Sequence, residues 1–126
     1  MRVLVMSFFL FFMNLTVQAG EIYFATRTVT TPKIESQIDC VIKAERLLEY
    51  LRYDRDLDHD KGSAWGKLRS DTEFKTGIRC AEGKGVIFIV VVGPKSQNIR
   101  KYANELAKTA ADDLNGVWLE ADEYKD

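Results

Sequence analysis

The chain has 126 residues, with 18 basic and 19 acidic side chains and a formal net charge of −1 at pH 7. This balance gives no electrostatic reason to expect nucleic acid or an anionic membrane surface as a partner. Hydrophobic residues make up 46% of the chain and alternate with polar segments throughout, which excludes an intrinsically disordered protein.

Residues 1–19 have the pattern of a secretory signal peptide. Arg2 provides a basic start, Val3–Met13 is an apolar run, and Val17–Ala19 has small residues where a signal peptidase cleaves. The apolar run is shorter than the ~20 residues that a helix needs to cross a bilayer. We therefore expect a periplasmic or secreted protein whose mature part, 20–126, forms a single domain and does not remain at the membrane.

The mature part is expected to begin with a strand and a helix. Glu21–Val29 is rich in β-branched and aromatic residues, which predicts a strand, and Pro32 then ends it. From Ser36 to Tyr53 the apolar residues recur at helical spacing. Cys40 lies on this apolar stripe and is therefore expected to face the core.

The second half of the chain is expected to contain three strands and a helix. After a long polar connection at Asp54–Arg69, Glu73–Cys80 alternates apolar and polar residues, as a half-buried strand does. Val86–Val92 is apolar on both faces, which predicts a central strand. The apolar pattern predicts a helix over Ser96–Leu114, and Val117–Ala121 is expected to form a last strand.

The element order β-α-β-β-α-β predicts an α+β fold of the ferredoxin-like type, with a four-stranded antiparallel sheet and two helices on one face. In this topology the first helix begins at the edge of the sheet where the second strand ends. Cys40 would lie near the start of that helix and Cys80 at the end of that strand, so we expect a disulfide between them. The alternative is a redox or metal site. The spacing is not C-x-x-C, however, and zinc would need two more ligands where the chain has one histidine, His59.

The segments IDCVIKAERLL and TGIRC…GVIFIVVVG carry a resemblance to a known group. With the export signal and a cysteine in each segment, the chain resembles small uncharacterised exported proteins of Gram-negative bacteria. The resemblance implies a periplasmic location and the two-cysteine β-α-β-β-α pattern. It implies no activity.

An acidic stretch in the polar connection is the first candidate site. Its aspartates do not match a calcium-binding EF-hand loop in either register, because the glycine and the acidic residue at position twelve are missing. Three interpretations remain: a solvated loop, a weak cation site, or an anionic patch that docks a basic partner with a nearby tryptophan as its anchor. The residues concerned are Asp54, Asp56, Asp58, Asp60 and Trp65.

Enzymatic chemistry has little support in the sequence. His59 lies in a charged segment rather than in a packed scaffold, as a catalytic triad requires. The two cysteines are better explained as a bridge than as nucleophiles. We therefore expect no catalytic residues, no metal and no cofactor, and a small hydrolase is the least favoured alternative.

The face of the sheet without helices is the second candidate site. An apolar central strand leaves half of its side chains exposed on that face unless something covers them. The cover could be the segment Trp65–Leu68 folded back, a second copy of the chain, or a target protein. RNA is disfavoured by export, by net acidity and by the missing strand motif of RNA-binding domains. The expected lining of this face is Tyr23, Ala25, Arg27, Lys75, Arg79 and Trp118.

The sequence therefore predicts an exported, non-enzymatic protein that binds another protein, through the open face or through Asp54–Trp65. Bacterial periplasmic inhibitors and immunity-type proteins have this size and acidity and this lack of catalytic motifs, although fold does not fix function. A small-ligand or cation-binding periplasmic module is the alternative.

Overall fold

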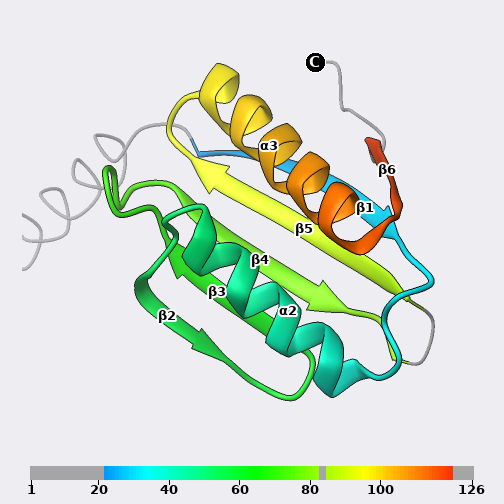
Figure 1. Cartoon of the computed structure of the whole chain (residues 1–126). Helices are drawn as coiled ribbons and strands as arrows, with labels where there is room; N and C mark the ends of the chain where they lie inside the picture. The colour runs from blue at the N-terminus through cyan, green and yellow to red at the C-terminus, as the bar shows by residue number, and fades with distance from the viewer. Residues whose placement is uncertain (1–21, 83–84, 121–126) are drawn as a thin grey trace, which may run out of the picture.

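The computed structural model of the chain describes residues 22–82 and 85–120 (Figure 1). The expected signal peptide, 1–19, lies outside the described residues. The described part contains two helices and an open six-stranded antiparallel sheet with the strand order β2-β3-β4-β5-β1-β6. The elements in chain order are β1 Tyr23–Thr30, α2 Gln37–Tyr50, β2 Arg55–His59, β3 Ser63–Lys67, β4 Lys75–Cys80, β5 Val86–Gly93, α3 Ser96–Leu114 and β6 Val117–Glu120.

The α+β class is confirmed, but the four-stranded sheet is wrong. Both helices lie on one face of the sheet, α2 over β2, β3 and β4, and α3 over β1, β5 and β6 (Figure 1). The four expected strands are neighbours in the order β4-β5-β1-β6. The two extra strands come from 54–69, which was expected to be a connection and instead forms a hairpin at the edge of the sheet.

Packing against α2 explains why this charged segment forms strands. Ala64, Gly66 and Leu68 are buried on the helix side, whereas alternate residues of β3 face away from the helices. Asp60 closes the turn, because its carboxylate accepts hydrogen bonds from the backbone N–H groups of Gly62 and Ser63 at 2.9 and 2.8 Å. Each strand of the hairpin has only five residues, so the hairpin depends on the neighbouring β4 and α2 for its stability.

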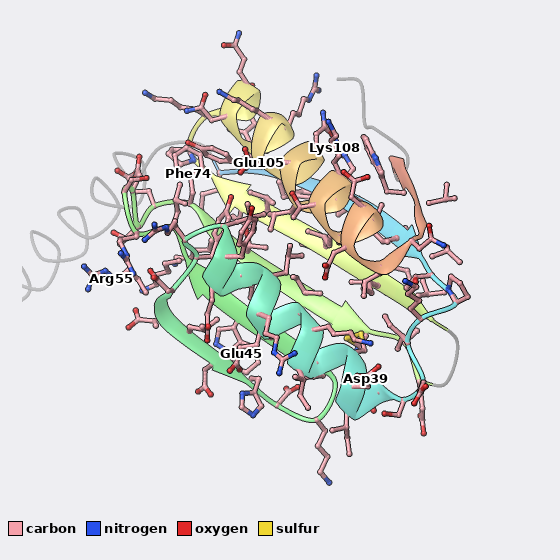
Figure 2. The ribbon with its side chains drawn as sticks, in the orientation of Figure 1. Asp39, Glu45, Arg55, Phe74, Glu105 and Lys108 are labelled. Atoms are coloured by element: carbon pink, nitrogen blue, oxygen red, sulfur yellow. A yellow bond between two sulfur atoms is a disulfide. The ribbon has the colours of Figure 1, made fainter. Side chains whose placement is uncertain are left out.

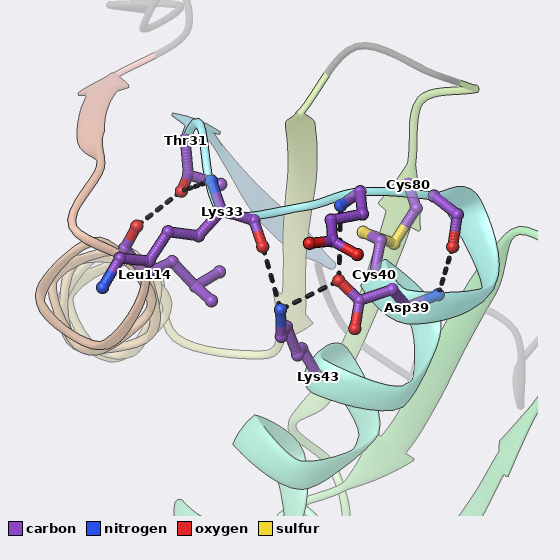
Figure 3. Close-up of polar contacts among 9 residues, drawn as sticks. Thr31, Lys33, Asp39, Cys40, Lys43, Cys80 and Leu114 are labelled. Carbon is purple, nitrogen blue, oxygen red and sulfur yellow. Dashed lines mark hydrogen bonds and ion pairs between the residues drawn. A yellow bond between two sulfur atoms is a disulfide. The ribbon is translucent and has the colours of Figure 1, made fainter.

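The disulfide between Cys40 and Cys80 is present and buried. Its Cα atoms are 6.0 Å apart, and it joins the first turn of α2 to the end of β4 (Figure 3). Gln37, at the start of the same helix, donates a side-chain hydrogen bond to the carbonyl of Cys80 at 3.0 Å. Ser36 caps the helix by accepting from the backbone N–H of Asp39. The start of α2 is therefore attached to the sheet covalently and by hydrogen bonding.

The core fills the space between the helices and the sheet. The inward side chains of β5, Ile87, Ile89 and Val91, are buried beneath α3, which contributes Leu106 and small alanines. Phe74 lies near the start of α3 (Figure 2), and its ring meets that of Tyr102 edge-on at 5.1 Å. Within the described ranges, neither helix is long and apolar enough to span a membrane.

Candidate functional site

The face of the sheet opposite the helices, called the open face below, is strongly apolar at its centre. Phe24 is 67% exposed, Phe88 44% and Trp65 38%. No described element covers this face (Figure 1). The apolar side chains on it include Phe24, Trp65, Val86, Phe88, Val90, Val92 and Val117.

The segment Trp65–Leu68 does not cover the open face. Ser63–Lys67 forms strand β3, so Trp65 stands on the open face, whereas Leu68 is buried on the opposite side. Of the three possible covers, the segment folded back over the sheet is therefore the one that the structure contradicts. The hairpin widens the open face instead of shielding it.

Two of the expected residues, Lys75 and Arg79, do lie on the open face, but four others do not. Tyr23, Ala25 and Arg27 point to the helix side of β1, where Tyr23 packs against the core and Ala25 is buried. Trp118 pairs with Val29 across β6 and β1, which puts it on the helix side as well. The expectation that these residues line the open face is wrong.

Arg27 shows why the side chains of β1 face opposite to the directions expected from the sequence. Its side chain is only 2% exposed, and its Nε donates to Asn104 Oδ1 of α3 at 2.8 Å while Nη1 donates to the carbonyl of Thr26 at 2.7 Å. A charged side chain is tolerated in the interior when it has such partners. Phe24 is consequently on the exposed side of the strand, although it is the more hydrophobic residue.

The register of the sheet places specific open-face residues side by side. Trp65 on β3 is opposite Gly77 on β4, which is opposite Val90 on β5. In the next row Lys67 is opposite Lys75, which is opposite Val92. Side chains directly opposite each other on one face lie ~5 Å apart, so these six residues form a continuous surface.

A hollow of about 390 Å³ lies over Gly77 in this surface. We call it the Gly77 hollow. Trp65, Val90 and Val92 contribute apolar walls, and Asp56, Lys67 and Lys75 contribute charged groups. This hollow was not predicted from the sequence, although a glycine in the middle of an alternating strand marks a bulge, a bend or a close approach by another molecule.

The four aspartates of the hairpin are engaged separately and do not form a cluster. Asp54 forms an ion pair with Arg69, and Asp56 forms one with Lys67 at 2.8 Å. Asp58 accepts a hydrogen bond from the backbone N–H of His59, and Asp60 closes the turn. Among the described residues, no group of three or more His, Cys, Asp or Glu side chains could hold a metal ion.

The only histidine of the chain makes a surface contact. His59 Nδ1 pairs with a carboxylate oxygen of Glu45, which lies on the side of α2 toward β2 (Figure 2). The imidazole is more than half exposed. This contact joins the hairpin to the helix, and it requires no catalytic role for His59.

The ion pairs of Asp54 and Asp56 predict a loss of stability in acid. Arg69 lowers the pKa of Asp54 and Lys67 lowers that of Asp56, chiefly through hydrogen bonds to the carboxylates. A carboxylate whose pKa is lower in the folded state stabilises the protein when the pH is above its unfolded-state pKa of about 3.9. This stabilisation disappears as the pH falls through the folded-state pKa. The double variant Asp54→Asn, Asp56→Asn should therefore lose less stability than the wild type between about pH 5 and pH 2.

Urea unfolding at the two pH values measures this difference. Asp112→Asn is the control, because Asp112 is exposed on α3 and forms no ion pair with another described residue. The control should show the wild-type pH dependence. Equal acid sensitivity in the double variant and the wild type would contradict the assignment of the two ion pairs.

The chain was compared with known protein families, with curated proteins and with solved structures, and none of these comparisons gave a match.

Proposed function

We propose that this protein is an exported, non-enzymatic protein that acts by binding another protein through the open face of its sheet. The observation that carries the proposal is the exposure of Phe24, Trp65 and Phe88 on one face that no described element covers. Contiguous apolar patches of this kind mark interaction sites in soluble proteins, and tryptophan is among the residues most enriched at binding hot spots. An inhibitor or immunity-like protein would use such a face.

The disulfide supports the location that we propose, and the strand order supports the framework of the fold. A buried disulfide in a small domain is typical of oxidising compartments. The strand order β4-β5-β1-β6, with the two helices on one face, supports a ferredoxin-like framework. We regard the β2–β3 hairpin as an addition to that framework, and export to the periplasm as the route by which the bridge forms.

A protein partner suits the open face better than a small molecule does. Small-molecule sites usually enclose most of the ligand surface, whereas the open face is a broad sheet surface with one hollow. Its edge carries polar groups such as Asp58, which is opposite Trp65. An apolar centre with a polar rim is the usual arrangement of a protein–protein interface.

Charge substitutions on the open face test this proposal. Phe88→Asp should reduce recovery of a specific partner from the native source at least about tenfold, the effect of losing a modest hot spot. Capture with mass-spectrometric identification provides the readout. The fold should be retained, because Phe88 already faces solvent.

Ile38→Asp is the matched control. Ile38 is 71% exposed, but it lies on α2, on the other side of the molecule from the open face. It should recover the partner as the wild type does. If Phe88→Asp and Ile38→Asp behave alike, the open face is not the binding surface.

A further inference from the structure

Gly77 is a glycine that the fold does not require. A Cβ atom built at Gly77 would have no atom of the described residues within 4 Å, whereas one at Gly66 would collide with the Tyr53 carbonyl and one at Gly93 with the Phe74 ring. Gly77 also has no positive φ. Glycine weakens a strand interior, and one of the usual reasons for its presence is that another molecule approaches the backbone there.

The neighbouring tryptophan does not fill the space over this glycine. An aromatic side chain opposite a glycine on the next strand often covers it, and Trp65 is in that position. The Trp65 indole has no atom within 4 Å of the Cβ position, so it leaves the glycine open. Trp65 is therefore a wall of the Gly77 hollow rather than its cover.

Two cations flank the hollow along the same strand. Lys75 and Arg79 are two residues before and after Gly77, so all three lie on the open face, about 7 Å apart in succession. Both are exposed, and neither forms an ion pair with a carboxylate among the described residues. Lys67, by contrast, is paired with Asp56.

We propose that the Gly77 hollow is the anchor point for an extended acidic segment of the partner protein. An apolar side chain of that segment enters the hollow between Trp65 and Val90, and acidic side chains two residues to either side meet Lys75 and Arg79. The matching pattern is acidic-x-apolar-x-acidic, because alternate residues of an extended chain share a face and repeat every ~7 Å. The inference rests on the proposed function and adds the chemistry of the partner.

Lys75 and Arg79 favour this occupant over a second copy of the chain, because the Asp56 carboxylate beside the hollow is already paired with Lys67. A two-fold pairing centred on the hollow would bring Lys75 and Arg79 of one copy close to the same residues of the other. Like charges opposed across an interface are unfavourable. An acidic segment neutralises them instead.

The test uses defined peptides and the oxidised protein. The probe is the peptide Thr-Glu-Thr-Phe-Thr-Glu-Thr, and its counterpart has lysines in place of the glutamates. Titration followed by ¹H–¹⁵N NMR should shift the amide signals of Gly77 and its neighbours with the acidic peptide. The lysine peptide should bind at least about tenfold more weakly, the effect of replacing attraction by repulsion at two sites.

The variant Gly77→Val distinguishes an effect on peptide binding in the hollow from an effect on the stability of the fold. Valine fills the hollow with a side chain suited to a strand, so thermal stability should be retained while affinity for the acidic peptide falls at least about tenfold. Thr30→Val is the control, because Thr30 is on the same face at the far end of β1, opposite Val86. It should bind the peptide as the wild type does.

Several results would overturn the inference: no shift at millimolar peptide, equal binding of both peptides, or unchanged binding in Gly77→Val. A concentration-dependent dimer that Gly77→Val abolishes would assign the hollow to a second copy instead. The partner capture described above keeps the two proposals apart. If Phe88→Asp no longer captures the partner but Gly77→Val still does, the result supports the open face as the binding surface and contradicts the Gly77 hollow as the anchor point.

Discussion

Replacing Cys40 and Cys80 together by alanine is expected to lower the free energy of unfolding by about 4 kcal/mol, the chain-entropy value for a loop closed over 40 residues. For a domain of this size, that corresponds to a melting temperature roughly 20 °C lower. The reason is that the bridge restricts the unfolded chain by holding the start of α2 to the end of β4. Urea unfolding of both proteins without reductant measures the difference.

A reductant provides the internal control for this prediction. It should destabilise the wild type by about the same amount and leave the alanine variant unchanged, because the variant has no other cysteine. A loss well below 1 kcal/mol in the variant would show that the bridge does not restrict the unfolded chain as assumed. Two free thiols in the protein purified from its natural host would contradict export.

Gly66→Ala is expected to cost about 3 kcal/mol, the upper part of the range for overpacking a tightly packed site. A Cβ at Gly66 would lie 2.1 Å from the carbonyl oxygen of Tyr53. The obstacle is backbone rather than a flexible side chain, so strand β3 would have to move away from the segment that follows α2. Thermal or chemical unfolding measures the loss.

Gly77→Ala is the matched control for Gly66→Ala. Gly77 is on the neighbouring strand, and in the part of the chain that the structure describes no atom lies within 4 Å of a Cβ there. Alanine should therefore leave stability unchanged or raise it by about 0.5–1 kcal/mol, because it restricts the unfolded chain without strain in the folded one. Equal losses in the two variants would contradict the packing described for both glycines.

The parts of the fold that could be predicted are those with a strong local pattern. The helices α2 and α3 follow from apolar residues at helical spacing, and β4 follows from its strict alternation. The central position of β5 follows from its being apolar on both faces. The Cys40–Cys80 bridge followed from combining the cysteine count with this topology, and the structure confirms it.

The hairpin could not be predicted, because its residues are weak strand formers. Arg55–His59 contains three charged residues and a single aliphatic one, Leu57, and charged residues carry no strand signal of their own. The strands form because Ala64, Gly66 and Leu68 pack beneath α2 and because β4 offers hydrogen-bonding partners. Both conditions come from segments that are distant in the sequence.

The sequence of β1 also did not show which of its two faces would be buried. One face offers Tyr23, Ala25, Arg27 and Val29, and the other offers Phe24 among threonines. Hydrophobicity alone favours neither. The choice is made by α3, where Asn104 supplies an acceptor for the buried Arg27 side chain.

By itself, the sequence determined the α+β class, the positions of both helices and the cysteine pairing, because periodicity and covalent chemistry are properties of short segments. It also determined that the apolar central strand would leave apolar side chains exposed on the face of the sheet without helices. Only the tertiary structure decided which residues form the open face and where the Gly77 hollow lies. Those features depend on strand register and on packing between distant segments, and a single residue of register shift exchanges the two faces of a strand.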